Sequence, residues 1–217
     1  MSQSGGLFGP WDMQLFVLGA TGRTGREIVA VASARGHRVT AYVRSPQKLE
    51  HNGHGLVITQ GDVLQAQGLS KALAGHDAVL SALGLPAKRA LRPSTFMTES
   101  AASTVAAMKR ANVHRLAIVS AAVLFPASGP FYRFFRWLLH NHALDLSAME
   151  TVVEASDLDW TIARPPRLVH SSDEQRRVVS GALPEAGYSL SFRALATFLV
   201  DCVEEDTHRR QVVGIAR

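Results

Sequence analysis

Short apolar runs alternate along the chain with longer segments in which apolar residues recur every three to four positions. Runs rich in Val, Ile and Leu are typical of strands that are buried on both faces of a sheet. We predict strands at residues 13–19, 37–44, 55–62, 76–84, 114–122, 159–165 and 210–217. Segments with helical spacing predict helices at residues 25–36, 69–75, 94–112, 131–158 and 191–205.

Strands and helices alternate throughout this prediction, and no segment is repeated. This order is typical of an α/β fold of the Rossmann type, a doubly wound parallel sheet with helices on both faces. We expect residues 13–217 to form one such domain, with the chain after Pro165 folding back as a small C-terminal lobe on the substrate side. Residues 1–12 are rich in glycine and are expected to be a flexible leader.

Composition narrows the class of protein. The chain has 217 residues, of which 47% are hydrophobic and 19% charged, as in ordinary globular proteins. No window reaches the roughly 18 consecutive apolar residues that a membrane-spanning helix needs. The net charge of +5 is spread along the chain, whereas nucleic-acid binders gather basic residues on one element. A single cysteine, Cys202, fits a reducing, cytoplasmic setting and is expected to be a buried hydrophobe. The oligomeric state stays open, with a monomer favoured.

The sequence GATGRTG, residues 19–25, stands between the first predicted strand and the first predicted helix. Gly19 permits a tight turn, Gly22 lets a pyrophosphate approach the backbone, and Gly25 lets the helix pack closely on the strand. The amino end of the helix then offers free amides and the positive end of its dipole to phosphate. In this position the motif predicts a dinucleotide site, although the same glycines alone would fit a structural turn.

The end of the second predicted strand distinguishes between dinucleotides. An NAD site usually carries an acidic residue there, but this chain has Arg44 and Ser45. A guanidinium can bind a phosphate with two parallel hydrogen bonds, so the pattern favours NADP(H). Arg23 could add a second charge. Arg44 could also be an ordinary solvated arginine, and Asp62, a candidate acceptor for the adenine amino group, could instead cap a helix.

The catalytic Tyr-x-x-x-Lys pair of many short-chain dehydrogenases is missing. The tyrosines and the residues four positions after them are Tyr42 and Pro46, Tyr132 and Arg136, and Tyr188 and Phe192. This argues against alcohol–ketone chemistry, in which the lysine lowers the pKa of the tyrosine. Reduction of a flavin-like π system needs only stacking and orientation by the protein. The proton would come from water or from Ser120, whose hydroxyl could otherwise cap a strand end.

One face of the predicted helix at 131–158 is apolar. Its residues are Phe131, Phe134, Phe135, Leu138, Leu139 and His142. Core packing is the first interpretation, a lid over the acceptor the second, and a peripheral membrane helix the third. The pairs His51 with His54 and His140 with His142 lack a third ligand nearby, so we expect surface histidines and no metal.

Several motifs together carry a family resemblance. They are GATGRTG, VRSPQKL, GDVLQA, AGHDAVLSALG and SDLDWTIARPPRL. With these motifs the chain resembles the atypical short-chain dehydrogenase/reductases, and more closely the flavin reductase/biliverdin-IXβ reductase group and its bacterial NAD(P)H-binding relatives. The resemblance runs from Met13 to Leu168 and continues more weakly through SFRALATFLVD.

The resemblance implies an NADPH-dependent hydride transfer to a flat conjugated acceptor such as a flavin or a linear tetrapyrrole. It assigns the pyrophosphate to Gly19, Thr21, Gly22, Arg23, Thr24 and Gly25, the 2′-phosphate to Arg44 and Ser45, the adenine to Asp62 and Val63, the ribose to Leu83 and Gly84, and the nicotinamide end to Ser120, Ala121 and Pro165. Ser120 is the catalytic candidate.

The acceptor end departs from the resembled group. That group has a histidine after its double proline, whereas this chain reads RPPRL, with Arg167 there. Arg167 could meet the propionates of a tetrapyrrole or a flavin phosphate, and Phe125 and Trp137 are the other candidate substrate residues. The alternative function is a non-catalytic NADP(H)-binding sensor or assembly factor of the same fold. A sugar-nucleotide enzyme is disfavoured by the missing Tyr–Lys pair.

Overall fold

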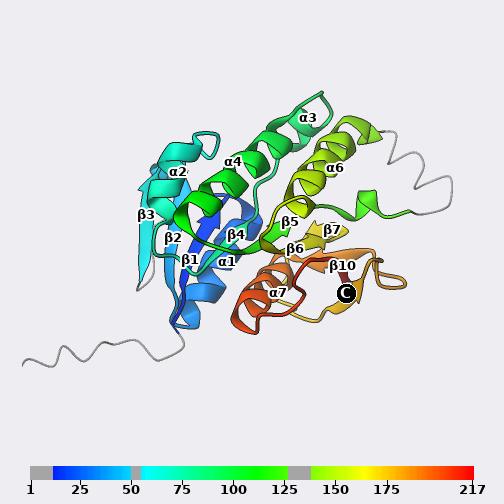
Figure 1. Cartoon of the computed structure of the whole chain (residues 1–217). Coiled ribbons are helices and arrows are strands. Elements are labelled where there is room, and N and C mark those ends of the chain that lie inside the picture. The colour runs from blue at the N-terminus through cyan, green and yellow to red at the C-terminus, as the bar shows by residue number, and fades with distance from the viewer. Residues whose placement is uncertain (1–11, 50–54, 127–137) are drawn as a thin grey trace, which may run out of the picture.

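An eight-stranded sheet forms the centre of the molecule (Figure 1). The computed structural model describes residues 12–49, 55–126 and 138–217. The strands lie in the order β3-β2-β1-β4-β5-β6-β10-β8. Their bounds are Gln14–Leu18 for β1, Arg38–Val43 for β2, Leu56–Gln60 for β3, Ala78–Ser81 for β4, Arg115–Val119 for β5, Asp159–Arg164 for β6, Arg177–Ser180 for β8 and Gln211–Ala216 for β10.

Every neighbouring pair from β3 to β10 is parallel, and β8 alone runs antiparallel, against β10. The strand β1 pairs with both β2 and β4, so that Val17 stands opposite Ala41 on one side and Leu80 on the other. The order of the strands reverses between β1 and β4. In open α/β sheets, a crevice for a ligand forms at the carboxyl ends of the strands at this point. The doubly wound parallel sheet predicted from the sequence is therefore confirmed.

Helices cover both faces of the sheet (Figure 1). Their bounds are Arg23–Ala34 for α1, Ala66–Leu73 for α2, Ala87–Ala90 for α3, Phe96–Ala111 for α4, His140–Glu154 for α6 and Phe192–Glu204 for α7. The helices α1 and α7 pack together on one face, and α2, α4 and α6 pack in a row on the other. Each layer buries its own apolar cluster against the sheet, one around Ile28 and Leu195 and the other around Met97 and Met149.

Local signals account for several helix ends. The hydroxyl of Ser191 accepts a hydrogen bond from the amide of Ala194 at 2.8 Å, so Ser191 caps α7 as predicted. The helix α1 ends before Gly36, which has a φ of +91° that favours glycine.

Cys202 in α7 is a buried free thiol, and burial raises its pKa to about 12, so it remains a packed, neutral side chain.

The C-terminal third contains strands that the hydrophobic pattern did not predict. The strands β7, Arg167–Val169, and β9, Ser189–Ser191, pair in parallel as a separate two-stranded sheet. Two 3-10 turns also occur, η1 at Pro46–Lys48 and η2 at Ala122–Leu124. Of the helix predicted at 131–158, the structure describes α6. The three phenylalanines of its predicted apolar face, Phe131, Phe134 and Phe135, lie outside the described residues.

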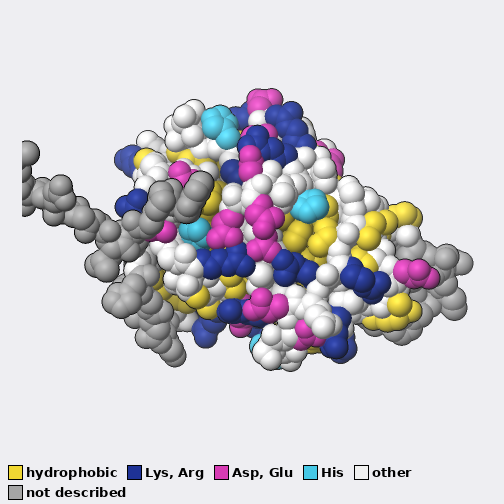
Figure 2. Space-filling model, turned by 90° about the horizontal axis from the view of Figure 1, so that it is seen from below, with side chains coloured by type: hydrophobic (Ala, Val, Ile, Leu, Met, Phe, Trp, Pro, Cys, Tyr) yellow, Lys and Arg dark blue, Asp and Glu magenta, His cyan; other side chains and the backbone are white. Residues whose placement is uncertain are grey.

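Charged side chains of both signs are interspersed on the face that Figure 2 shows, rather than gathered into one basic patch. Among the ion pairs, the Nη1 of Arg209 lies 3.1 Å from the Oδ2 of Asp159, and the Nε of Arg193 lies 2.9 Å from the Oε1 of Glu174. The helices within residues 12–49, 55–126 and 138–217 are all too short or too polar to cross a membrane.

Candidate cofactor site

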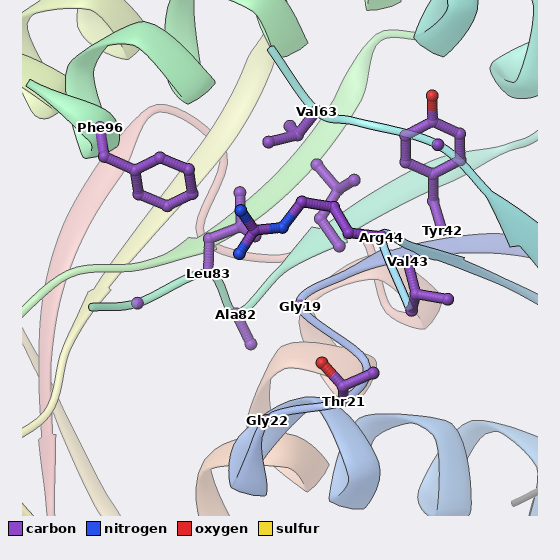
Figure 3. Close-up of a pocket in the computed structure, with 13 residues that line it drawn as sticks. Gly19, Thr21, Gly22, Tyr42, Val43, Arg44, Val63, Ala82, Leu83 and Phe96 are labelled. Carbon is purple, nitrogen blue, oxygen red and sulfur yellow. The ribbon is translucent and has the colours of Figure 1, made fainter. Parts of the chain in front are cut away.

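A crevice lies at the carboxyl ends of β1, β2, β4 and β5 and consists of two adjoining cavities. The first cavity, of about 160 Å³, is lined by Thr21, Tyr42, Arg44, Gly61, Val63 and Phe96 (Figure 3). The second cavity, of about 370 Å³, is lined by Arg23, Met97, Ser120, His142, Leu146 and Phe192. Both cavities are also lined by Gly22, Ala82, Leu83 and Gly84. The glycine turn and the segment after β4 therefore stand between two halves of one crevice.

The glycine turn has no room for side chains. Gly19 has a φ of +79°, and a Cβ there would lie 2.5 Å from the carbonyl oxygen of Ala82. A Cβ on Gly25 would lie 2.1 Å from the carbonyl oxygen of Gly19. The turn closes with a 2.9 Å hydrogen bond from the amide of Gly22 to that same oxygen. These contacts bring the backbone of the turn against both β4 and α1.

The amino end of α1 is open. Its cap is Gly22, which has no side chain to accept hydrogen bonds from the first turn of the helix. The amides at the start of a helix have no partners within it and carry the positive end of its dipole. Because Gly22 lines both cavities, this end of α1 can receive a pyrophosphate at the middle of the crevice.

Arg44 is exposed at the end of β2, and its side chain extends into the first cavity (Figure 3). Within the described residues, no carboxylate lies within ion-pairing distance of its guanidinium. Arg26 connects the neighbouring loop to the glycine turn, since its Nη2 donates to the carbonyl of Lys48 at 2.8 Å and its Nε to the carbonyl of Thr21 at 3.3 Å. Arg26 thus joins two segments that border the cavity, a role the sequence pattern did not reveal.

Tyr42 forms a wall of the first cavity and packs its ring against Phe16 at 5.5 Å. A Cβ on Gly61 would lie 2.0 Å from the Tyr42 hydroxyl, so glycine is needed where the phenol approaches the backbone. Burial, together with the negative charge of Asp62, raises the pKa of Tyr42. The phenol is therefore neutral near pH 7 and presents an uncharged wall.

The second cavity contains two buried polar atoms without hydrogen-bond partners among the described residues, the Oγ of Ser120 and the Nδ1 of His142. Ser120 follows β5 and is 7% exposed; its amide donates to the carbonyl of Ala163 at 2.8 Å. Its hydroxyl makes no hydrogen bond to the strand end, contrary to the capping role considered above. Much of the remaining lining is apolar, including Met97, Leu146 and Phe192.

Asp145 fixes α6 against this cavity. Its buried carboxylate accepts from the amide of Met97 at 3.0 Å and from the amide of Thr98 at 2.9 Å. The hydroxyl of Thr98 donates to the same carboxylate at 2.8 Å. A side chain of α6 therefore caps the amino end of α4, and the first turn of α6, which carries His142, is held in place.

A sequence model of the NAD(P)H-binding family matches residues 19–206, which include the glycine turn, Arg44, Ser120 and His142. The chain belongs to the NAD(P)H-binding family. The predicted resemblance is therefore confirmed at this level.

Three similar proteins show how far this likeness reaches. The chain is 29% identical to oxidoreductase stcQ of Emericella nidulans over 226 residues, covering 92% of this chain and 80% of stcQ. It is 31% identical to photosystem II assembly factor Ycf39 of Synechocystis over 109 residues, covering 50% of this chain and 33% of Ycf39. The structure of a candidate NADH-flavin reductase from Streptococcus pneumoniae shares the fold, with a TM-score of 0.75, 21% identity, and coverage of 94% of this chain and 99% of that one.

The crevice fits the cofactor of an NAD(P)H-binding protein. The glycines at 19 and 25 let the backbone of the turn pack tightly against the segment after β4 and against α1, and the uncapped end of α1 offers amides to a pyrophosphate. The second cavity offers the unpartnered hydroxyl of Ser120. A bound NAD(P)H would be held by the turn between the two cavities and would supply a hydride donor to the second.

The structure brings most of the predicted cofactor residues of this family member to the crevice. Those that line it are Gly19, Thr21, Gly22, Arg23, Thr24, Arg44, Val63, Leu83, Gly84 and Ser120. Arg23 lines the second cavity, where its Cζ lies 4.9 Å from the centre of the Phe192 ring, and Arg44 lines the first. The expected second charge beside Arg44 is therefore not found in the first cavity.

Other predicted cofactor residues support the crevice without lining either cavity. The Oδ1 of Asp62 accepts from the amide of Leu64 at 3.1 Å and stabilises the turn before α2, but the N-cap position of α2 is Gln65, so Asp62 does not cap this helix. Ser45 precedes η1 and accepts through its carbonyl from the amide of Lys48 at 3.1 Å. The carbonyls of Ala121 and Pro165 accept from the amides of Leu124 and Ala122. Gly25 is buried in α1.

Two of the three predicted substrate residues, Phe125 and Arg167, line neither cavity. Phe125 is buried, with its ring 4.7 Å from the Cζ of Arg164, and this arginine is paired with the buried Glu150. Phe125 therefore belongs to a packed cluster and not to the cavity wall. Arg167 is exposed on β7 and lines neither cavity, whereas the adjacent Leu168 lines the second. Trp137 lies outside the described residues.

His142 is the residue of the second cavity that sequence reasoning missed. The sequence pattern places His142 on an apolar helical face, and its pairing with His140 favours a surface histidine. The signal that indicates a site is the polar ring of His142 on that apolar face. Within residues 12–49, 55–126 and 138–217, no three His, Cys, Asp or Glu side chains gather closely enough to bind a metal.

Proposed function

We propose that the protein is an NADPH-dependent reductase that transfers hydride to a flat conjugated acceptor, such as a flavin or a linear tetrapyrrole. The observation that carries this proposal is the second cavity, which adjoins the glycine turn and combines a largely apolar lining with the unpartnered hydroxyl of Ser120. Its volume of about 370 Å³ lies within the range of small-molecule sites. The similarity to oxidoreductase stcQ supports the same class of reaction.

The preference for NADPH over NADH is supported by Arg44. Its guanidinium enters the first cavity, and no acidic side chain is among the residues that line this cavity. A ribose 2′-hydroxyl would find no carboxylate there, whereas a 2′-phosphate would find two or more N–H donors and a positive charge. The mildly basic net charge of +5 also favours the approach of an anionic cofactor.

The chain's own residues have three tasks in such a reaction. The glycine turn and α1 hold the pyrophosphate, and the bound NADPH supplies the hydride. The apolar lining of Met97, Leu146 and Phe192 excludes water and orients a flat ring. The hydroxyl of Ser120 can bind a polar atom of the acceptor. No residue in this scheme has to act as the tyrosinate of an alcohol dehydrogenase.

The test is steady-state oxidation of NADPH, followed by absorbance, with a panel of one flavin, one linear tetrapyrrole and one quinone. Reduction of at least one acceptor, with kcat/KM higher for NADPH than for NADH, is the expected result. Tight NADPH binding without turnover of any acceptor would refute the reductase.

A second candidate is a non-catalytic NADP(H)-binding sensor or assembly factor. The missing Tyr-x-x-x-Lys pair permits it, and the partial similarity to assembly factor Ycf39 favours it. The two candidates differ in what NADPH does. A sensor would bind the cofactor and leave it unoxidised with every acceptor of the panel, and it would change its affinity for a protein partner between NADPH and NADP+.

A further inference from the structure

The second cavity contains a pair of polar atoms that the fold leaves unsatisfied. The Oγ of Ser120 and the Nδ1 of His142 are both buried without partners among the described residues. A buried polar atom without a hydrogen bond is destabilising. Ser33, Ser103, Thr197 and Arg115 also have such atoms, but none of these residues lines a cavity of the crevice. The two residues that do line it come from separate elements, Ser120 from the end of β5 and His142 from the helix α6.

The position of His142 is fixed by packing rather than by a hydrogen bond of its own ring. Asp145, one turn later on α6, binds the amino end of α4, and Leu146 is buried in the wall of the same cavity. The part of α6 that directly follows the histidine is therefore anchored. A group held in this way is preorganised for a ligand, because little conformational freedom is lost when the ligand binds.

The burial of His142 and the charge of Asp145 set the acid strength of its imidazolium. Burial lowers its pKa, and the carboxylate of Asp145 opposes this effect. Arg23, from α1, is the other charged residue that lines the cavity, and the remaining lining residues are uncharged. A histidine with a lowered pKa is a stronger acid in its protonated form than an ordinary histidine.

We propose that His142 is a second catalytic group, which binds the acceptor together with Ser120 and supplies the proton that accompanies hydride transfer. This inference rests on the proposed reductase function. It defines the acceptor class as a conjugated molecule with a carbonyl or imine at the reacting end, because a hydroxyl and an imidazolium can both hydrogen-bond to such an atom.

The reaction balances with these groups. The acceptor gains one hydride, and so two electrons, from the dihydronicotinamide, which leaves as the oxidised nicotinamide. A proton passes from the imidazolium of His142 to the carbonyl oxygen or imine nitrogen of the acceptor, where the new O–H or N–H bond forms. The neutral imidazole of His142 then regains a proton from water, and Ser120 keeps its hydroxyl proton throughout.

The decisive variant is His142→Gln, which keeps a hydrogen-bonding side chain but cannot carry a proton. His140→Gln is the matched control, because His140 lies in the same helical turn, is exposed and lines neither cavity. Binding of 2′,5′-ADP, which carries only the adenosine half of the cofactor, verifies that each variant is folded. We expect kcat with the reducible acceptor to fall by about a hundredfold in His142→Gln, as for the loss of a general acid, while His140→Gln and 2′,5′-ADP binding stay within twofold of the wild type.

A second readout does not depend on turnover. The Cε1–H resonance of His142, assigned by its loss in His142→Gln, is followed by NMR in the wild-type protein. We expect it to shift with NADP+, which reaches the second cavity, and to stay in place with 2′,5′-ADP. An unmoved resonance with NADP+, or a wild-type kcat in His142→Gln, would overturn the proposal. If the wild type reduces no acceptor, the reductase function fails separately, and the NADP+ shift still decides whether His142 faces the cofactor.

Discussion

Arg44 provides the most direct test of cofactor choice. In Arg44→Ala, the first cavity loses its guanidinium, and the residues left in its wall are uncharged. Hydrogen bonds to charged groups contribute about 1.5–3 kcal/mol each when buried. Arg44 is exposed, so screening reduces this value, and we expect the lower end, about 1.5 kcal/mol, for the whole contact with the 2′-phosphate. That loss corresponds to a roughly tenfold weaker binding of NADPH.

NADH has no 2′-phosphate, so its dissociation constant is expected to change less than about twofold, which is below 0.5 kcal/mol. Titration calorimetry with NADPH and NADH measures both constants. Arg38→Ala is the control, because Arg38 is an exposed arginine at the opposite end of β2 and its loss changes the net charge equally. Equal losses for the two cofactors in Arg44→Ala, or an equal loss of NADPH binding in Arg38→Ala, would refute the assignment of Arg44 to the 2′-phosphate.

Three further predictions concern the scaffold that holds the crevice. Gly25→Ala places a Cβ 2.1 Å from the carbonyl oxygen of Gly19, so NADPH binding is expected to fall at least tenfold, about 1.4 kcal/mol, in calorimetry. Gly68→Ala in α2, where a Cβ would make only an ordinary contact at 3.7 Å, is the control and leaves binding unchanged. Arg115→Met removes the donors to the carbonyls of Asp159, Cys202 and Thr207, which lie 2.7–2.8 Å away. We expect the free energy of unfolding, measured in urea, to fall by about 3–5 kcal/mol. The control Arg110→Met, at an exposed arginine, should lower it by less than about 0.5 kcal/mol. Burial lowers the pKa of His76, so the unfolded state binds a proton at this residue more readily than the folded state. The contribution of His76 to stability is complete above its unfolded pKa of 6.5 and is lost as the pH falls toward the folded value. His76→Gln should therefore reduce the pH dependence of the free energy of unfolding in this range, measured by urea denaturation.

The alternation of strands and helices could be predicted from the sequence because its signals are local. Each central strand is a continuous apolar run, such as that around Phe16 and Val17, and each is followed by a segment with helical spacing. The short strands β7, β8 and β9 carry no such signal, because each is only three or four residues long and β7 and β8 contain no buried residue. Their pairing depends on contacts between segments far apart in the sequence, which a local pattern does not contain.

The first cavity was predictable for a related reason. The phosphate recognition proposed there would use main-chain amides in one tight turn and a cation at the end of the next strand, and both have fixed positions relative to the motif. The contribution of Arg26 was missed because its side chain acts on the carbonyls of Thr21 and Lys48, and any donor long enough to reach them would give the same sequence pattern.

The second cavity was harder to predict because its wall comes from seven separate parts of the chain. The glycine turn, the segment after β4, the start of α4, the end of β5, α6, β7 and α7 each contribute one or a few residues. An apolar residue such as Met97 or Phe192 looks like ordinary core until the sheet brings it to the crevice. The same holds for His142, whose unpaired nitrogen becomes visible only when α6 is in place.

The acceptor cavity can change in sequence independently of the cofactor turn, because the two are constrained by different parts of the structure. The cofactor half is constrained by backbone contacts at Gly19 and Gly25, where a single added carbon meets a carbonyl. The acceptor half is constrained only by side chains, and α6 is held by Asp145 through the amino end of α4 rather than through the ligand. Substitution of His142 or Leu146 is therefore expected to alter the acceptor while the sheet, the turn and the cofactor contacts stay intact. Exchanging these side chains should move acceptor preference without changing the affinity for NADPH.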